Sequence, residues 1–199
     1  MKSSIPRRLH EIIQNIHRTH PFSFGVGALQ AQTPTTPSQP RDCGPFVQQF
    51  YNWYVAKLNA LIKRNILGLE SALEVTFREK RSSFSPELVK DLKEDLAASK
   101  KSHGKIVGLD FDPFLNAQDI AERYLVGKIT PKGDHYWVEV FGVWGGQKNS
   151  NPDVVPELAF ENGQWIFTNF HYGKTDIPVN ENLVSILQGL KKDGQKKAK

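Results

Sequence analysis

The spacing of the hydrophobic residues in this chain changes once, near residues 109–119. Before that stretch the apolar residues recur every three to four positions, as in amphipathic helices, and after it they alternate, as in strands. Helices followed by a run of strands, with no repeated β-α-β unit, are typical of an α+β fold. We therefore expect N-terminal helices packed on an antiparallel β-sheet. The sequence has no glycine-rich phosphate loop, which disfavours the nucleotide-binding α/β folds.

Three segments before the change predict helices. The apolar residues between Phe46 and Ile62 keep the spacing of a helix with a wide buried stripe, and Asp42-Cys43-Gly44-Pro45 is typical of a helix start. Residues 66–79 fit either a helix or a strand, and we favour the helix. Ser85-Pro86-Glu87 predicts the start of a third helix, because serine caps the first turn and proline fits within it.

The segments after the change predict four strands and a final helix. The clearest turn residues are Pro131-Lys132-Gly133-Asp134 and Asn162-Gly163. Pro156 predicts an edge strand or a bulge, since proline has no backbone N–H to donate. The expected elements are strands at 121–130, His135–Trp144, Val154–Glu161 and Gln164–Tyr172, a polar loop at 145–152, and a C-terminal helix at 180–190 with Asn180 as its cap.

The net charge of +5 belongs to the two ends of the chain. Residues 1–41 carry five basic residues and one acidic residue, and residues 191–199 carry five lysines and one aspartate. Each end therefore has a net charge of +4, which leaves −3 for residues 42–190. A folded surface that binds nucleic acid needs clustered positive charge. We expect a single domain at 42–190, a basic disordered tail at 191–199 and no nucleic-acid partner.

Residues 1–41 allow two interpretations. A basic start, a stretch of small or apolar residues at 22–31 and the polar Gln32 have the outline of an export signal. The same residues also fit a disordered extension, and residues 33–41 have the composition of a linker. Export predicts a periplasmic, envelope or secreted protein, whereas an uncleaved extension predicts a cytoplasmic one. No apolar run reaches the ~20 residues that a membrane-spanning helix needs, so we expect no transmembrane segment.

Two motifs resemble the signatures of a known bacterial family. Residues 44–54 read Gly-Pro-Phe-Val-Gln-Gln-Phe-Tyr-Asn-Trp-Tyr, and residues 112–119 read Asp-Pro-Phe-Leu-Asn-Ala-Gln-Asp. Both are similar to motifs of the family called domain of unknown function 3828, and the strand with Trp165 lies where that family has a tryptophan-containing strand. The resemblance covers roughly residues 44–173 and extends to the nuclear-transport-factor-2-like superfamily.

This resemblance implies a cone-shaped α+β fold, in which helices close one side of a strongly curved sheet and leave a pocket between them. It also implies export to the bacterial envelope, where many members of the family are found. It brings no catalytic residue and no cofactor. The chain departs from the lipid-anchored members at Cys43, because the residues before it are polar or stiff where a lipidation signal needs small and apolar ones.

Five side chains within residues 110–119 offer oxygen or amide groups: Asp110, Asp112, Asn116, Gln118 and Asp119. A hard cation such as calcium binds such oxygens, but the spacing is not that of an EF-hand. The same residue types also cap backbone groups in turns. We favour this structural role, assign no metal, and keep the five residues as candidates for a structural loop or a ligand pocket.

Three further candidates for lining a pocket are Tyr54, His135 and Trp137. Tyr54 belongs to an aromatic group on the first helix, a group more typical of a core than of a ligand site. His135 and His171 fall on different expected strands, where they could approach each other. The sequence has no local motif for Ser/His/Asp or Cys/His catalysis, and one cysteine cannot form an internal disulfide. We therefore assign neither a catalytic residue nor a cofactor.

The strand His135–Trp144 is apolar on both faces, because Trp137, Phe141 and Val143 alternate with Tyr136, Val138, Val140 and Trp144. One face would pack on the helices. The other would meet a partner chain or leave a large exposed patch, which usually marks an interface. We predict a homodimer through the sheet.

Two functions fit these observations. The first is a non-enzymatic module of the cell envelope that binds a small apolar ligand or a protein. The second is a small pocket enzyme of the hydrolase, isomerase or dehydratase type, with Asp and His as acid–base groups. Because the acidic residues gather in one loop and the strands supply mainly aromatic and valine side chains, the sequence favours binding.

Overall fold

The computed structural model describes residues 42–66, 68–101, 107–172 and 181–197. The chain divides into two compact units, residues 1–38 and 39–199, and every described residue belongs to the second. The expected export signal and linker within residues 1–41 lie outside the described residues, as does the expected cap Asn180.

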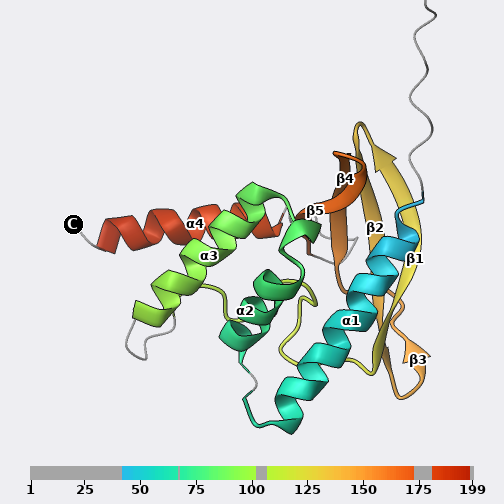
Figure 1. Cartoon of the computed structure of the whole chain (residues 1–199), viewed down its shortest axis with the longest axis horizontal. Helices are drawn as coiled ribbons and strands as arrows, with labels where there is room; N and C mark the ends of the chain where they lie inside the picture. The colour runs from blue at the N-terminus through green and yellow to red at the C-terminus, as the bar shows by residue number, and fades with distance from the viewer. Residues whose placement is uncertain (1–41, 67, 102–106, 173–180, 198–199) are drawn as a thin grey trace, which may run out of the picture. The chain divides into compact units, whose positions relative to one another are not determined.

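The described elements follow the order of an α+β fold (Figure 1). Helices come first, an antiparallel sheet follows, and a helix ends the domain. The elements are α1 (Gly44–Lys63), α2 (Leu69–Glu79), the short 3-10 helix η1 (Arg81–Ser83), α3 (Pro86–Lys101), β1 (Arg123–Lys132), β2 (His135–Trp144), β3 (Gln147–Lys148), β4 (Val155–Glu161), β5 (Gln164–His171) and α4 (Leu183–Lys197).

Helix starts follow the capping residues of the sequence. Asp42 accepts a hydrogen bond from the Gly44 amide at 2.9 Å at the start of α1. Ser85 Oγ accepts from the Leu88 amide at 3.2 Å, which confirms Ser85-Pro86 as the start of α3. The ambiguous segment at 66–79 contains helix α2.

The C-terminal helix begins later and ends later than expected. At the start of this helix Asn182 accepts a hydrogen bond from the Ser185 amide at 3.0 Å. The helix continues to Lys197, so its C-terminal part lies within residues 191–199, which we expected to form a disordered tail. Lys191 donates to Glu94 of α3 at 2.6 Å and so ties this extension to the neighbouring helix.

The sheet is open and antiparallel, with the order β1-β2-β4-β5 and with β3 paired to the end of β2. The turn between β1 and β2 is shorter than expected, because Pro131 and Lys132 still pair with β2 and leave only two residues at the tip. The β4–β5 connection is the expected two-residue hairpin, in which Asn162 and Gly163 both have positive φ.

Two details of the sheet settle expectations about its edges. Pro156 pairs with Phe170 of β5, and a bulge lies next to it, where the register shifts between Glu157 and Leu158 and leaves Thr168 of β5 as the extra residue. β4 lies between β2 and β5 and is not an edge strand. The expected loop at 145–152 contains the two residues of β3, whose polar side chains gave no strand pattern.

The β1 edge is partly covered by one side chain from α1. The amide of Gln48 donates to the Tyr124 carbonyl at 2.8 Å and accepts from the Val126 amide at 3.0 Å. A carboxamide that pairs with backbone N–H and C=O in this way imitates one residue of a neighbouring strand.

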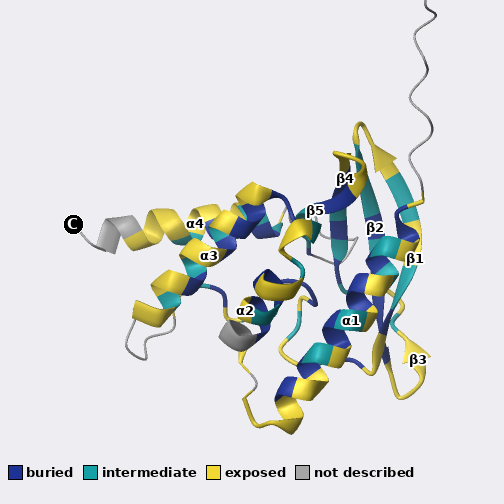
Figure 2. Ribbon diagram, in the orientation of Figure 1, coloured by how far each residue is buried: buried dark blue, intermediate teal, exposed yellow. Residues whose placement is uncertain are grey.

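The inner face of the sheet packs on α1 and is filled by aromatic rings. Figure 2 shows the buried residues of α1 as a stripe along the helix. Phe50 of α1 contacts Phe167 of β5 with ring centroids 4.8 Å apart, and it also packs edge-on against Phe114 at 5.7 Å. This layer occupies the space between α1 and the sheet where the family resemblance implies a pocket.

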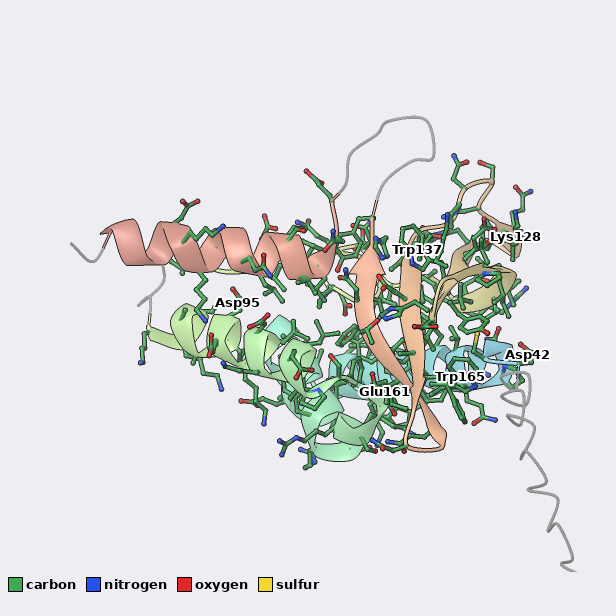
Figure 3. All side chains as sticks on the ribbon, turned by 90° about the horizontal axis from the view of Figure 1, so that it is seen from above. Asp42, Asp95, Lys128, Trp137, Glu161 and Trp165 are labelled. Carbon is green, nitrogen blue, oxygen red and sulfur yellow. The ribbon has the colours of Figure 1, made fainter. Side chains whose placement is uncertain are left out.

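Trp137, labelled in Figure 3, belongs to the outer face, because its neighbours Tyr136 and Val138 and also Trp165 pack with the core. Two apolar residues of this face are covered within the chain, since Phe141 is 7% exposed and Val143 is 1% exposed. Lys148 lies over the Phe141 ring, with its Nζ 4.0 Å from the ring centroid. The apolar patch that motivated the predicted homodimer is thus reduced, and the homodimer stays a prediction.

Candidate functional site

The carboxylate of Asp112 closes the loop in which it lies. Its Oδ1 accepts hydrogen bonds from the amides of Phe114 and Leu115, at 2.9 and 3.2 Å. Its Oδ2 accepts one from the hydroxyl of Tyr54 at 2.7 Å. The chain around it turns back on itself, because the Asp112 amide donates to the Ala117 carbonyl at 3.0 Å. Asp112 therefore performs the capping role that the sequence favoured.

Two more tyrosine hydroxyls hold the same loop. Tyr51 of α1 donates to the Phe114 carbonyl at 2.9 Å, and Tyr172, which follows β5, donates to the Pro113 carbonyl at 2.7 Å. Burial raises the pKa of both tyrosines well above its usual value, so both remain donors at neutral pH. Residues 112–114 are thereby fixed between the first helix and the end of the last strand.

Asp112 and Tyr54 form an enclosed acid pair. Burial raises the pKa of Asp112 from its ordinary 3.8 to about 6, although the hydrogen bonds from Tyr54 and the two amides oppose this rise. The Tyr54 ring stacks on Phe50 at 5.6 Å and meets Phe114 edge-on at 5.3 Å. Tyr54 is buried, Asp112 is half-buried, and both oxygens of Asp112 already accept hydrogen bonds, so the pair is placed to stabilise the loop.

The other oxygen-bearing candidates of the loop do not converge. Asn116 donates from its side chain to the Asp153 carbonyl at 3.0 Å, and Gln118 lies 3.5 Å from the carbonyl of Asp110. Asp110 and Asp119 are exposed. In the part of the chain that the structure describes, no group of three His, Cys, Asp or Glu residues is arranged to hold a metal ion.

His135 belongs to a different group on the outer face, here called the histidine cluster: His135, Trp137, Glu157 and His171. The two oxygens of Glu157 contact one nitrogen of each histidine, His135 Nδ1 at 2.5 Å and His171 Nε2 at 2.6 Å. Trp137 stacks on His171 with ring centroids 4.0 Å apart. The two histidines approach each other as the sequence suggested, but through a glutamate that the sequence analysis did not single out.

The histidine cluster orients two imidazoles without enclosing them. When both rings are neutral, the carboxylate of Glu157 keeps one N–H of each ring directed at itself, as carboxylates do beside catalytic histidines. The His135 side chain is 40% exposed, and the cluster lies on an open sheet face. Thr168 donates to the Glu157 carbonyl at 3.2 Å and adds a link between β5 and β4.

A hollow of about 530 Å³ lies beyond β5, between the β4–β5 hairpin and the segment from the end of α2 to the start of α3. Its apolar walls are Phe84, Pro86, Val89 and Ile166. A second hollow of about 350 Å³ shares Arg81, Pro86 and Val89 with the first and continues along α3. We call the two hollows together the groove.

The charged side chains of the groove differ in how they are neutralised. Glu79 is held by Lys57 at 2.7 Å and by Arg78 at 3.1 Å, and these contacts lower its pKa. Glu94 is held by Lys191 at 2.6 Å, which lowers the pKa of Glu94 in the same way.

Three cations on the same walls have no such partner. Arg81 and Lys90 form no ion pair with any carboxylate in the described ranges, and Lys93 contacts only the ring of Phe77, 5.6 Å from its Nζ. The groove therefore offers free positive charge beside an apolar wall.

Sequence reasoning did not find the groove. Its residues come from 78–97 and 161–166, two segments that are joined by the Ser85 amide donating to the Phe167 carbonyl at 2.9 Å and by the rings of Phe84 and Phe167, 5.3 Å apart. No local motif marks such a meeting of distant segments.

No family model, no curated protein and no solved structure matches this chain. No helix in the described ranges has both the length and the apolar composition required to cross a bilayer.

Proposed function

We propose that this chain is a non-enzymatic binding module and that the groove holds its ligand. The single observation that carries this proposal is the hollow of about 530 Å³, which has an exposed Pro86 and a buried apolar floor of Phe84, Val89 and Ile166. Arg81, which forms no ion pair in the described ranges, lies on its wall and leads to Lys90 and Lys93 of the second hollow. The volume of the first hollow falls in the range of ligand sites, and apolar walls with a few polar groups are typical of them.

The family resemblance contributes an expected fold and an expected cellular location to this proposal. A nuclear-transport-factor-2-like cone and an envelope protein of the domain-of-unknown-function-3828 type would agree with helices that precede an open antiparallel sheet. In such a cone the ligand would lie between helices and sheet. Because aromatic rings such as Phe50 and Phe167 fill that space here, we place the ligand beyond the β5 edge instead.

A binding role is favoured over the pocket enzyme by the positions of the titratable groups. An enzyme of that kind needs at least two such groups within reach of one substrate. Tyr54 is buried and the half-buried carboxylate of Asp112 is engaged by Tyr54 and by its own loop, whereas His135 and His171 contact Glu157 across the sheet. The walls of the groove contain none of these four residues.

The test is binding of a neutral apolar dye, N-phenyl-1-naphthylamine, followed by its fluorescence. Ser82→Trp places a large ring at an exposed wall of the groove and should weaken dye binding about tenfold or more, because the ring occupies the dye's space. Ser150→Trp makes the same chemical change at an exposed residue between β3 and β4 and should leave binding unaltered. Absence of dye binding, or equal loss in both variants, would contradict the proposal.

A further inference from the structure

We infer that the occupant of the groove is an extended segment of a partner protein, with an apolar side chain at the hairpin end and acidic side chains along α3. This inference rests on the proposed function, since it names the ligand class of the same site. Three observations support it: the length of the groove, the distribution of its charges, and the contrast between its two ends.

The groove runs along several turns of α3, as an extended chain requires. The second hollow follows one side of α3, from Pro86 through Val89 and Lys93 to Ala97. At a rise of 1.5 Å per helical residue, this path alone is about 16 Å long. An extended peptide covers about 16 Å with five residues. A compact small molecule would fill the first hollow and leave this path unused.

The positive charges along α3 favour an occupant that carries acidic groups. Arg81, Lys90 and Lys93 line the second hollow and form no ion pair with a carboxylate of the described residues, although the charge of Lys90 acts on Glu94 at longer range. The one acidic side chain there, Glu94, is already bound by Lys191. A carboxylate of the occupant would therefore meet cations without having to displace an existing ion pair. Arginine at this position also allows a two-point contact with a carboxylate.

The hairpin end of the groove has the opposite character and sets the direction of the occupant. In the first hollow Arg78 is paired with Glu79, and Arg81 lies where the two hollows meet. Glu161, labelled in Figure 3 at the end of β4, forms no ion pair in the described part of the chain and would repel an acidic group near the hairpin. Phe84, Val89 and Ile166 form an apolar surface there. The occupant therefore places its apolar side chain near the hairpin and its acidic side chains near Lys90 and Lys93.

Fluorescence polarisation with two labelled peptides tests this inference. The probe is a short peptide in which one leucine is followed by glutamates, and its control replaces every glutamate by glutamine. The acidic peptide should bind about tenfold more tightly at low salt, since its glutamates can pair with Arg81, Lys90 and Lys93 and the glutamines of the control cannot. The difference should shrink as salt is added, because screening weakens exposed charge contacts.

A matched pair of charge reversals locates the contact. The double variant Arg81→Glu and Lys90→Glu should lower the affinity for the acidic peptide about tenfold or more. The double variant Arg123→Glu and Lys128→Glu makes the same change in net charge on exposed residues of β1, where Figure 3 labels Lys128. The affinity of this control should match that of the unaltered protein.

The outcomes separate this inference from the proposed function. Equal affinity for the two peptides, or equal effects of the two double variants, would overturn the inference that the occupant is an acidic segment. Binding of the neutral dye in the groove without binding of either peptide would leave the binding module intact and make its ligand a small molecule, which also overturns the inference. If neither the dye nor either peptide binds, the proposed function and this inference are both wrong.

Discussion

Asp112 is the side chain for which the structure makes the sharpest quantitative prediction. Its carboxylate is enclosed by Tyr54 and by the turn at Phe114 and Leu115. The variant Asp112→Asn keeps a carbonyl oxygen for the two backbone amides. Its NH₂ group takes the place of the second oxygen, and the Tyr54 hydroxyl can rotate to accept from it. The substitution thus removes the ionisable group while preserving the turn.

The magnitude follows from the raised pKa of Asp112, which is about 6 in the folded chain against an ordinary value of 3.8. Because the folded-state pKa is the higher of the two, the folded chain retains the proton longer, and the free energy of unfolding falls as the pH rises between these values. At 1.36 kcal/mol per pH unit, the decrease amounts to about 3 kcal/mol and is complete near pH 7. Asp112→Asn lacks this decrease.

The variant should therefore match the unaltered protein near pH 4 and exceed its stability by about 2 to 3 kcal/mol near pH 7. Urea unfolding at a series of pH values, followed by tryptophan fluorescence, measures this difference. Asp119→Asn, an exposed neighbour, is the control and should show no such trend. A stability difference that does not change with pH, or a variant that is less stable near pH 7, would refute the reasoning.

Four further predictions concern other contacts. Glu157→Ala removes the common acceptor of two imidazoles and should lower the free energy of unfolding by about 1 to 2 kcal/mol. Glu157→Gln retains an acceptor and should lower it less. Urea unfolding of the two variants measures the difference. Gln48→Ala uncovers the β1 edge, so it should lower the free energy of unfolding by about 1 kcal/mol and increase light scattering on heating. An unchanged scattering profile would contradict the edge-covering role. Gly127→Ala places a methyl group 2.5 Å from a ring carbon of Phe141 and should destabilise by about 1 to 3 kcal/mol, read as a lower Tm. Equilibrium sedimentation at micromolar concentration should give the mass of the predicted homodimer, and a monomer alone would refute it.

The elements that the sequence predicted well are those with local signals. The alternation of aromatic and valine residues placed His135–Trp144 at the bounds of β2, and Asn162-Gly163 identified the β4–β5 hairpin. Gln147–Lys148 escaped prediction because β3 is too short to alternate and pairs only with the end of β2. The sequence analysis named Asn180 as the cap and did not consider Asn182, whose side chain accepts a hydrogen bond in the first turn, because spacing alone does not show which side chain reaches the helix start.

The candidate site was less predictable because its geometry depends on distant residues. The role of Asp112 is decided by Tyr54, which is 58 positions away along the chain. His135 and His171 were noticed as a pair, but the position of Glu157 between them follows from the register of β4, which a bulge shifts. The groove depends on residues of α3 lying beside a hairpin formed much later in the chain.

The tyrosine contacts at residues 112–114 have a consequence for the order of folding. Tyr51 and its acceptor are 63 positions apart, and Tyr172 and its acceptor are 59 positions apart. During synthesis α1 emerges early, yet the loop can be fastened on both sides only after β5 has left the ribosome. Contacts between such distant positions slow folding, because the chain must close long loops before it gains them. A nascent chain that ends before Gln164 would therefore expose the apolar stripe of α1, and it is in this interval that a chaperone would protect the protein from aggregation.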